Sequence, residues 1–342
     1  MNDIVFTREC GVELKRLLKD VSPSDIYLLM DCNSLNYCMG HLQLDIPVSN
    51  RIVLEAGESN KSLESVEVIW QVLSDNCARR NAVLVNLGGG VITDMGGFAA
   101  SCFKRGITSV NVPTTLLAQI DASVGGKTGV NFNGLKNEIG TFSIPCHVVI
   151  DNVFLPTLPR RQVLSGFAEM LKHGLLSDEE HWMELMQVDL LDVGSEEFLA
   201  LIQKSVAVKN AIVREDPCER GIRKALNFGH TVGHAIESVA IEHCQEIYHG
   251  DAVAYGMIAE LYLSVKKMGF DEGLYKNIRS FICELYPPCR EFDNPGRLYQ
   301  LMLHDKKNEH TGVNFTLLQA IGKPVINQYC EYDEIMEALK QI

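Results

Sequence analysis

The sequence predicts an α/β N-terminal domain, built on a doubly wound parallel sheet, and an all-α C-terminal domain. Over residues 1–158, short apolar runs alternate with helical patterns, which is the order of a parallel sheet whose crossovers are helices. From residue 159 onward, apolar residues recur at helical spacing. A chain of 342 residues is also long enough for two domains of about 150 residues each. We therefore expect one domain at 1–158 and a second at 159–342.

The N-terminal sheet is predicted from four short apolar runs. Each run is apolar at successive positions, so both of its faces are expected to be buried between helix layers. A helical pattern at 63–76 lies between the first two runs. Together these segments predict a Rossmann-like sheet. The strand candidates are residues 26–30, 82–87, 109–112 and 147–150.

In the second domain, apolar residues mark one face of each expected helix. Leu164, Phe167 and Leu171 form one such stripe, and a second begins at Val232. Residues 216–221 have the composition of a turn and are expected to connect two helices. No strand is expected in this domain.

Composition and charge exclude several classes of function. The 44 acidic and 31 basic residues give a net charge of −13, which disfavours a nucleic-acid partner. No apolar run approaches the roughly 18 residues that cross a bilayer, so no membrane partner is expected. The start of the chain lacks the pattern of a secretory signal, and the eleven cysteines show no paired spacing. We therefore expect a cytoplasmic protein with reduced thiols.

Two glycine clusters are candidates for anion binding. Gly88-Gly89-Gly90 follows a predicted strand and precedes a predicted helix, where backbone N–H groups can approach a phosphate. The spacing differs from Gly-x-Gly-x-x-Gly, so a tight strand–helix turn explains it equally well. The second cluster, residues 123–129, contains Lys127, which is either a solvated loop lysine or a cation on a mobile glycine loop.

A metal site is indicated by histidines in the second domain. His230 and His234 are four residues apart on a predicted helix and therefore share one face. Glu169 faces away from the apolar stripe of its own helix, and His249 precedes another helix. One carboxylate and two imidazoles with an open position are typical of a catalytic zinc. Spacing alone favours His230 and His234 as the imidazole pair, or else a polar helix surface.

These motifs occur together with others in a recognisable order. The chain resembles the 3-dehydroquinate synthase family, which belongs to the sugar-phosphate cyclases and is related in fold to the iron-containing alcohol and glycerol dehydrogenases. The matching segments span most of the chain in the order of the family. They are residues 57–61, 88–98, 104–106, 112–118, 121–131, 135–140, 165–172, 223–237, 249–251 and 305–307.

The resemblance implies a carbon–oxygen lyase of the shikimate pathway, which leads through chorismate to the aromatic amino acids. Its substrate would be the sugar phosphate 3-deoxy-D-arabino-heptulosonate 7-phosphate, and its products 3-dehydroquinate and phosphate. The implied steps are transient oxidation at C5 by NAD, phosphate elimination, re-reduction, ring opening and intramolecular aldol closure. The implied cofactors are NAD and Zn²⁺, with Co²⁺ as an alternative, and the implied assembly is a homodimer. The substrate would bind between the domains, which would close on it.

The resemblance assigns the metal to Glu169, His230 and His249, which come from separate segments and leave an open tetrahedral position. His234 would then face the substrate, against the spacing argument. His173, four residues after Glu169, would be an inert polar neighbour or a residue that supports a ligand.

A basic lining is implied for the substrate, which carries a carboxylate and a phosphate. Arginine can hold either group through two parallel hydrogen bonds, and lysine acts as a point charge. The implied catalytic residues are Lys127, Lys172, Arg223 and His234, with Lys172 and His234 as candidates for proton relay. One of the two lysines at 306 and 307 would reach the substrate. The implied substrate-binding residues are Arg105, Lys127, Asn137, Lys172, Lys209, Arg223, Asn227, His234, Lys306 and Lys307.

NAD is assigned mainly to the first domain. Asp31 and Asn33 would bind its adenosine part. Gln162 stands where the family commonly has an acidic residue, so one contact to the cofactor differs. The other residues implied in cofactor binding are Glu58, Lys61, Gly89, Gly90, Asp94, Thr114, Thr115, Asp121, Lys127, Lys136, Phe154, Thr157 and Leu158.

Three alternatives remain open at this point. A polyol or alcohol dehydrogenase would share the cofactor and the metal but would not need so many cations for its substrate. Another sugar-phosphate cyclase would usually alter the segment 126–129, which is intact here. A non-catalytic binding protein would be expected to lack Lys172, Arg223, His234 or a metal ligand, and all of these are present.

Overall fold

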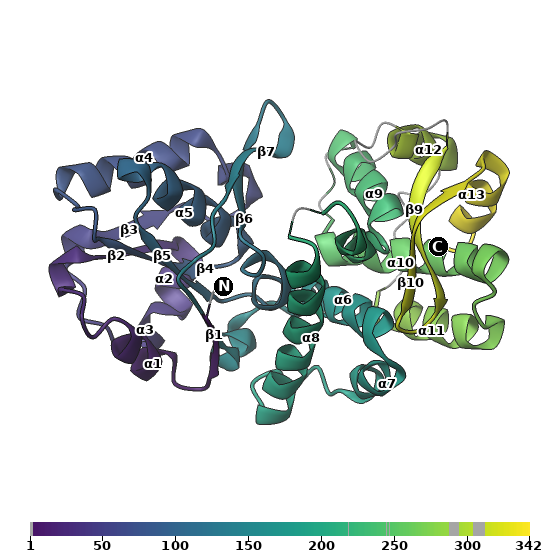
Figure 1. Cartoon of the computed structure of the whole chain (residues 1–342), viewed down its shortest axis with the longest axis horizontal. Coiled ribbons are helices and arrows are strands. Elements are labelled where there is room, and N and C mark those ends of the chain that lie inside the picture. The colour runs from purple at the N-terminus through teal and green to yellow at the C-terminus, as the bar shows by residue number, and fades with distance from the viewer. Residues whose placement is uncertain (1–2, 218, 244, 246, 287–293, 304–311) are drawn as a thin grey trace. The chain divides into compact units, whose positions relative to one another are not determined.

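The computed structural model describes residues 3–217, 219–243, 245, 247–286, 294–303 and 312–342 (Figure 1). Lys306 and Lys307, which the resemblance assigns to the substrate, therefore lie outside the described residues. The chain forms two compact units. Unit 1 contains Met1–Pro159 and Asp189–Val206, and unit 2 contains Arg160–Val188 and Ala207–Ile342.

Unit 1 is organised by a six-stranded parallel sheet in the order β1-β8-β5-β4-β2-β3. The four predicted strands are confirmed as β2, β4, β5 and β8. The edge strands β1 and β3 are not predicted from the sequence, because β1 is only partly buried and β3 has only 4 residues. The bounds are β1 Asp3–Thr7, β2 Ile26–Asp31, β3 Arg51–Leu54, β4 Val83–Gly88, β5 Thr108–Pro113 and β8 His147–Asp151.

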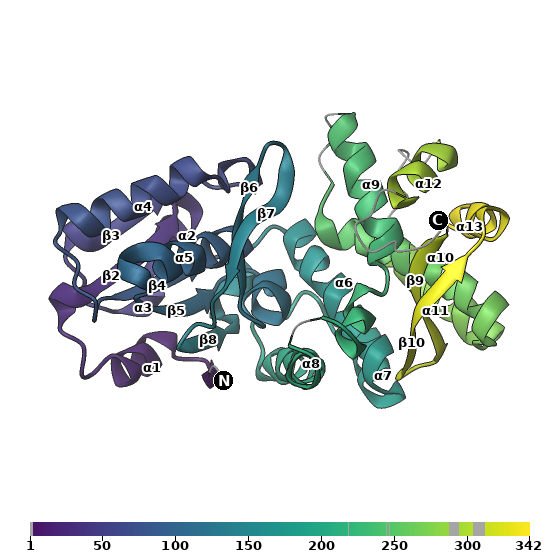
Figure 2. The ribbon, with the colours of Figure 1, turned by 45° about the horizontal axis from the view of Figure 1, so that its top comes forward.

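Helices cover both faces of this sheet, because successive side chains of a strand point to opposite sides. In β2, Leu28 and Met30 belong to one core cluster, and Tyr27 and Leu29 belong to the other. Figure 2 shows α1 and α4 on opposite sides of the strands, which confirms the doubly wound arrangement. The helices of this layer structure are α1 (Cys10–Leu17), α2 (Cys32–Tyr37), α3 (Met39–Leu42), α4 (Leu63–Asp75) and α5 (Gly90–Cys102).

The second glycine cluster leads into an antiparallel hairpin, β6 (Lys127–Phe132) and β7 (Leu135–Phe142). Both interpretations of Lys127 place it in a loop, but this residue begins strand β6. Asn133 and Gly134 turn with φ of 50° and 78°, the left-handed conformation that suits an Asn-Gly hairpin turn. A Cβ on Gly140 would lie 2.1 Å from the backbone oxygen of Thr128 on the facing strand, so the two backbones approach closely there.

Residues 189–206 follow the expected domain boundary but pack with unit 1. The side-chain amide of Asn152 donates to the carbonyl oxygens of Val193 at 3.0 Å and Ser195 at 2.6 Å. Arg8 donates to the carbonyl oxygen of Gly194 at 3.1 Å. Because Asn152 is buried, these bonds provide partners for a polar group that water does not reach. Unit 1 therefore consists of two separate stretches of sequence.

Unit 2 is mostly helical, but the all-α prediction is wrong for one part of it. An antiparallel hairpin is formed by β9 (Val313–Ala320) and β10 (Lys323–Cys330). In β9, Val313, Phe315 and Leu317 are buried, but Leu318 is buried as well, so its alternation is incomplete in the sequence. Helix α8 (Glu196–Glu215) is divided between the two units after Val206. The helices that lie wholly in unit 2 are α6 (Arg160–Ser177), α7 (Glu179–Gln187), α9 (His230–Glu242), α10 (His249–Met268), α11 (Glu272–Leu285), α12 (Pro295–Leu303) and α13 (Tyr332–Leu339).

The centre of unit 2 is α10, which packs against α6, α9, α11, α13 and β9. Most of its residues are buried, among them Gly250, Gly256 and Glu260. A buried helix that touches so many neighbours fixes their relative positions. Side chains from several helices can therefore be held close to one another by their packing against α10.

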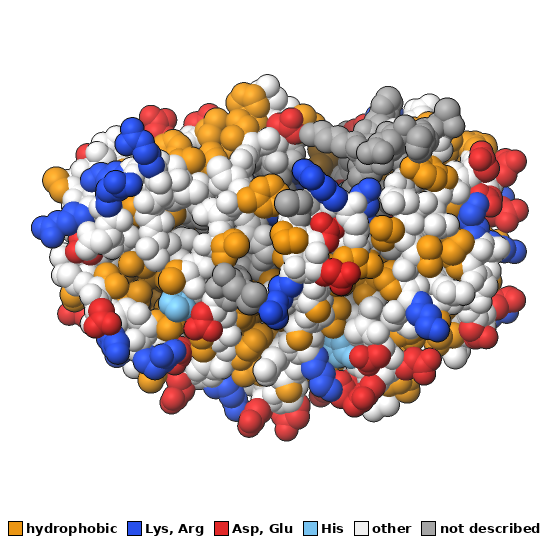
Figure 3. Space-filling view, viewed as in Figure 1, with side chains coloured by type: hydrophobic (Ala, Val, Ile, Leu, Met, Phe, Trp, Pro, Cys, Tyr) orange, Lys and Arg blue, Asp and Glu red, His pale blue; other side chains and the backbone are white. Residues whose placement is uncertain are grey.

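The surface carries charges of both signs. On the face shown in Figure 3, lysine and arginine side chains are scattered among aspartate and glutamate side chains. None of the described helices combines the length and the apolar character needed to cross a bilayer.

Candidate active site

Three side chains from three helices meet in unit 2. Glu169 lies in the middle of α6, His230 is the first residue of α9, and His249 is the first residue of α10. One ligand atom of each residue lies within 4.8 Å of the other two. The Nε2 atoms of His230 and His249 are 3.4 Å and 3.6 Å from Glu169 Oε1. These are the three residues that the resemblance assigns to the metal.

His234 lies beside this group, one turn along α9 from His230. Its ring centroid is 5.4 Å from that of His230 and 6.3 Å from that of His249. In the described part of the chain, the group that contains Glu169 and His230 is completed by His249 and not by His234. Spacing within one helix could not reveal this, because the group forms where the first residues of two helices come together.

Hydrogen bonds hold the far nitrogen of each imidazole. His230 Nδ1 lies 3.0 Å from the carbonyl oxygen of Phe228, and His249 Nδ1 lies 3.4 Å from Glu237 Oε2. With the proton of each ring kept on Nδ1, each Nε2 would give its lone pair to a bound cation. Metal-binding histidines are usually oriented by such a carbonyl or carboxylate partner. The donor set of one carboxylate oxygen and two imidazole nitrogens therefore fits Zn²⁺ or a similar cation.

Lys172 places a cation against the carboxylate of this group. Its Nζ pairs with Glu169 Oε2, and the two side chains are 2% and 0% exposed. Burial favours the neutral form of Glu169, but the Lys172 ammonium and the imidazoles outweigh it and hold the pKa of this carboxyl well below its usual range. Burial also disfavours charge on His249, but Glu169 and Glu237 outweigh it and raise the pKa of His249 to about 10. Glu169 is therefore ionised, as a metal ligand must be.

The start of α10 is anchored to α6. Arg161 Nη2 lies 2.9 Å from Asp251 Oδ2, and the Arg161 guanidinium lies 4.8 Å from the centre of the Tyr248 ring. One turn further along α6, Ser165 contacts Gly250. These contacts flank His249 on both sides in the sequence and so fix its position relative to Glu169.

Buried cations occur elsewhere in unit 2. Lys209 on α8 is 6% exposed, and Arg223, in the short helix Ile222–Asn227, is 4% exposed. Arg223 Nη1 donates a hydrogen bond to the carbonyl oxygen of Pro217 at 2.8 Å. Charged side chains are rarely this deeply buried unless the charge has a partner or a function. The predicted substrate-binding residues that belong to unit 2 are Lys172, Lys209, Arg223, Asn227 and His234.

The predicted turn at 216–221 holds this region in place. The Asp216 carboxylate accepts hydrogen bonds from the backbone N–H groups of Arg220, Gly221 and Arg223 at 3.0, 2.6 and 3.2 Å. The bond from Gly221 is the main cause that lowers the pKa of Asp216. An ionised aspartate therefore organises the backbone that presents Arg223.

Glu219 is a residue that sequence reasoning missed. It has the left-handed conformation, with φ of 57°, and its Oε1 accepts a hydrogen bond from Asn227 Nδ2 at 3.2 Å. A single carboxylate in a turn has no spacing pattern that could select it. Only its hydrogen bond with the predicted substrate residue Asn227 indicates a place in the site.

In unit 1, predicted cofactor residues gather at the carboxyl ends of neighbouring strands. Asp31 ends β2, and its side chain accepts a hydrogen bond from Ser34 N at 2.7 Å, which caps α2. Gly89 is the N-cap of α5 after β4, and Thr114, after β5, donates its N–H to the oxygen of Gly88 at 3.0 Å. Since β5, β4 and β2 are adjacent, these residues share one edge of the sheet. Parallel α/β sheets bind their ligands at this edge.

A polar network joins the predicted cofactor residues to a predicted substrate residue. Lys61 Nζ donates to Asp94 Oδ2 at 2.6 Å and to Asn137 Oδ1 at 2.5 Å. Asn131 donates to Glu58 Oε1 at 2.9 Å and accepts from Asn137 N at 2.9 Å. Burial raises the pKa of Asp94 to about 6, although the Lys61 ammonium opposes this shift. The fold therefore brings Glu58, Lys61 and Asp94 together with Asn137.

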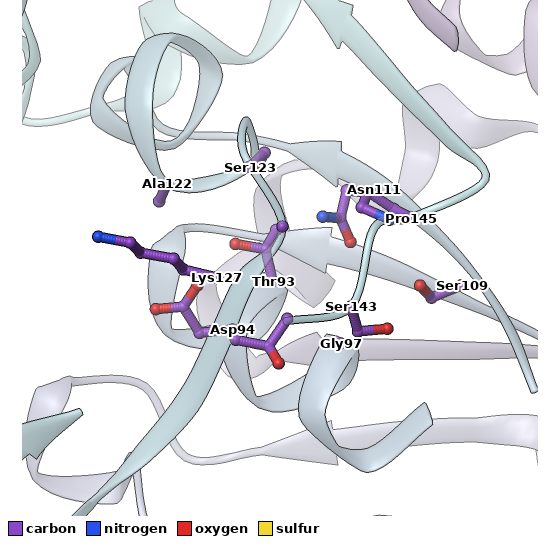
Figure 4. Close-up of a pocket in the computed structure, with 12 residues that line it drawn as sticks. Thr93, Asp94, Gly97, Ser109, Asn111, Ala122, Ser123, Lys127, Ser143 and Pro145 are labelled. Atoms are coloured by element: carbon purple, nitrogen blue, oxygen red, sulfur yellow. The ribbon is translucent and has the colours of Figure 1, made fainter. Parts of the chain in front are cut away.

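A small pocket opens beside Asp94, with Lys127 on the same side (Figure 4). Its wall is rich in hydroxyl and amide groups, and the buried Oγ of Ser123 has no hydrogen-bond partner among the described residues. Such a lining suits a polar ligand. The residues that line it are Thr93, Asp94, Gly97, Ser109, Asn111, Ala122, Ser123, Gly126, Lys127, Thr128, Ser143 and Pro145.

Other residues assigned to the cofactor or substrate are placed differently. Phe154 is fully buried in a core cluster, with its ring 5.7 Å from that of His41, so its side chain does not face an open site. Thr157 donates its hydroxyl to the oxygen of Phe154 at 2.6 Å. Arg105 and Lys136 are exposed. The structure also describes Asn33, Gly90, Thr115, Asp121 and Leu158.

Comparison with known proteins decides the family. The family model described as 3-dehydroquinate synthase N-terminal matches residues 51–165, and the one described as 3-dehydroquinate synthase C-terminal matches residues 166–308. The chain belongs to the 3-dehydroquinate synthase family. The resemblance found in the sequence is confirmed, and with it the conversion of 3-deoxy-D-arabino-heptulosonate 7-phosphate to 3-dehydroquinate in the shikimate pathway.

Relatives in this family match nearly the whole chain. The 3-dehydroquinate synthase of Parabacteroides distasonis is 48% identical over 98% of this chain and 96% of its own. That of Clostridium tetani is 36% identical over 94% of this chain and 86% of its own. A solved structure of 2-epi-5-epi-valiolone synthase from Streptomyces hygroscopicus subsp. jinggangensis, with NAD⁺ and Zn²⁺ bound, matches with a TM-score of 0.84 and 26% identity, covering 99% of this chain and 96% of that one. The predicted fold class is therefore confirmed, apart from the hairpin in unit 2.

Proposed function

We propose that this chain performs the reaction of its family with Glu169, His230 and His249 holding a divalent cation and with NAD at the carboxyl ends of β2, β4 and β5. The observation that carries the proposal is the meeting of these three ligands beside the buried cation of Lys172. A dehydrogenase would need the cofactor and the metal, but it would not need the additional buried cations of unit 2.

The choice of cofactors is supported by the donor atoms of the chain. One carboxylate and two oriented imidazoles suit Zn²⁺, and Co²⁺ accepts the same ligands. The related valiolone synthase was crystallised with NAD⁺ and Zn²⁺. When bound, the cation would act as a Lewis acid toward a substrate hydroxyl, and NAD would take up and return a hydride.

Binding of the substrate is assigned to the cationic side chains. The Arg223 guanidinium, which donates to the Pro217 carbonyl, would bind a carboxylate or a phosphate through two hydrogen bonds. Lys209 and Lys172 contribute point charges, which act more strongly where they are buried than they would in water. Arg105, Lys127 and Asn137 from unit 1, Asn227 from unit 2, and one of the lysines at 306 and 307 complete this proposed set.

Two residues are assigned to proton and charge movements. His234 lies beside the proposed metal ligands but outside their group, and in this proposal it exchanges a proton with the substrate. The Lys172 ammonium would stabilise negative charge that develops on a substrate oxygen near Glu169. Both roles use charge in a site that largely excludes water.

The proposal is tested by turnover without net oxidation. Purified protein with Zn²⁺, a catalytic amount of NAD⁺ and the heptulosonate phosphate should release inorganic phosphate far in excess of NAD⁺, with no lasting NADH absorbance. Accumulation of NADH without phosphate would overturn the proposal in favour of a dehydrogenase. As a matched pair, Lys172→Met should lower phosphate release by about 10²–10³-fold, and Lys276→Met, which removes an exposed ion pair with Glu272, should leave it unchanged.

The same proposal includes a homodimer and two domains that divide near residue 158. A sedimentation mass of twice 38.1 kDa for the purified chain would support the dimer, and a mass of one chain would overturn it.

A further inference from the structure

The N-terminus of α9 carries a metal ligand but lacks a capping side chain of its own. Its N-cap is Gly229, in the left-handed conformation with φ of 78°, and His230 is its first residue. The first N–H groups of a helix have no partner within the helix and need one from elsewhere. No side chain at position 229 could supply it, because a Cβ there would lie 2.7 Å from Met257 Cγ.

The missing cap comes from α10. Glu260 Oε2 accepts a hydrogen bond from Gly229 N at 2.6 Å, and Oε1 accepts from Thr231 N at 3.1 Å and from Val232 N at 3.4 Å. Glu260 is 0% exposed. A buried carboxylate is costly to desolvate, and three N–H donors at the positive end of a helix dipole offset that cost.

The backbone that Glu260 holds is the backbone that orients the metal ligand. Phe228, whose carbonyl oxygen accepts from His230 Nδ1, directly precedes Gly229. On the other side, a Cβ at Gly256 would lie 1.9 Å from the oxygen of Gly229, so the chain here lies directly on α10. The segment 228–232 is therefore fixed from both sides by α10, the helix that begins with His249.

We propose that Glu260 is a positioning residue for the metal centre, which places His230 relative to His249 by joining the first turn of α9 to the middle of α10. The inference rests on the proposed metal site at Glu169, His230 and His249. Glu260 touches neither metal nor substrate in this scheme. It acts through the backbone of residues 229–232. When its charge is lost, His230 shifts from the position that tetrahedral coordination of the cation requires.

The test uses the full chain loaded with Co²⁺, whose visible absorption reports ligand geometry. Glu260→Gln is nearly isosteric but places an amide N–H group against a cluster of backbone donors. The matched control is Ser264→Ala, one turn further along α10. Ser264 is also buried, donates to the Glu260 backbone oxygen at 2.7 Å and accepts from Leu318 N at 2.9 Å, so neither of these hydrogen bonds reaches α9.

We expect Glu260→Gln to weaken Co²⁺ binding by about 10- to 100-fold in competition with a chelator and to change the visible spectrum. Ser264→Ala should keep the wild-type Co²⁺ affinity and spectrum. In the metal-free chain it should lower the midpoint of unfolding by about as much as Glu260→Gln does. Wild-type affinity and spectrum in Glu260→Gln, or equal losses in both variants, would overturn the inference. Glu169→Gln separates the two proposals: if it leaves Co²⁺ binding unchanged, the metal site itself is wrong, and if it abolishes binding while Glu260→Gln does not, only the positioning role is wrong.

Discussion

The backbone N–H of Gly250 donates to Ser165 Oγ at 3.0 Å, and a Cβ at position 250 would lie 2.0 Å from the Ser165 carbonyl oxygen. At this contact α6 and the first turn of α10 approach each other closely. Glu169 follows Ser165 by one turn on α6, and His249 directly precedes Gly250. The separation between two of the proposed metal ligands is therefore set by a contact that only glycine permits.

Gly250→Ala should damage the metal site. The added methyl group forces α10 away from α6, which we expect to cost about 1–3 kcal/mol of unfolding free energy and to lower zinc affinity and phosphate release together. The measurements are urea unfolding and zinc titration. Gly40→Ala is the control, because a Cβ there meets nothing within 4 Å and its φ is not positive. An alanine at 250 that binds zinc as tightly as glycine does would refute the constraint.

Lys172→Met should leave Glu169 buried beside an apolar side chain. Since the Lys172 ammonium is the main influence that lowers the pKa of Glu169, that pKa should rise and zinc binding should become more sensitive to acid. We also expect phosphate release to fall by about 10²–10³-fold, as for the loss of one stabilising donor. Zinc titrations at several pH values measure the first effect. An unchanged pH dependence in this variant would contradict the assigned charge pairing.

Glu237→Gln should weaken the interaction that orients the His249 imidazole. The carboxylate lies 3.4 Å from His249 Nδ1, and loss of its charge reduces the basicity and the orientation of the imidazole. We expect a loss of zinc affinity of about 10-fold or more, measured by zinc titration. Glu272→Gln on the surface of α11 serves as the control, because it removes a carboxylate from an exposed ion pair. Equal affinities in the two variants would rule out this role for Glu237.

Asp94 should make stability depend on pH. Its folded pKa of about 6 lies above its ordinary value of 3.8, so the protonated carboxyl favours the fold. That contribution is complete below pH 3.8 and is lost as the pH rises through about 6. Asp94→Asn mimics the neutral form, so the variant should match the wild type in acid and become more stable by about 2–3 kcal/mol at neutral pH.

Urea unfolding of the NAD-free chain at several pH values checks the Asp94 prediction. Asp75→Asn, which alters an exposed carboxylate bonded to Gln71, provides the comparison. If the stability of wild type and of Asp94→Asn changed in parallel across this pH range, burial would not be what raises the pKa of the Asp94 carboxyl.

Much of the fold of unit 1 could be predicted, because its central strands are buried on both faces. Such strands read as continuous apolar runs, as in β4, and they are bounded by turns. The edge strand β3 and the hairpin β9–β10 do not show this continuous apolar pattern and are therefore not predicted. One face of β3 meets solvent over 4 residues, and β9 has adjacent buried leucines that obscure a period of two.

The site could be predicted only in part. His230 and His234 have a spacing that a helix explains, but the partner that completes the ligand group is His249, and the contact between α9 and α10 that brings it there is tertiary. Glu237 and Glu260 were not predicted for the same reason. Each acts on a residue of another segment, and a lone glutamate inside an amphipathic helix is otherwise typical of a solvated face.

Because the segment Asp189–Val206 belongs to unit 1, the segments of the two units alternate along the polypeptide. The chain passes from one unit to the other after Pro159, returns after Val188 and passes over again after Val206. No single cut in the polypeptide can release either unit whole. A fragment that ends at residue 159 would lack the carbonyl groups that Asn152 binds, and a protease nick near 159 should leave two pieces that still copurify. Neither unit can therefore be produced as one continuous fragment of the chain.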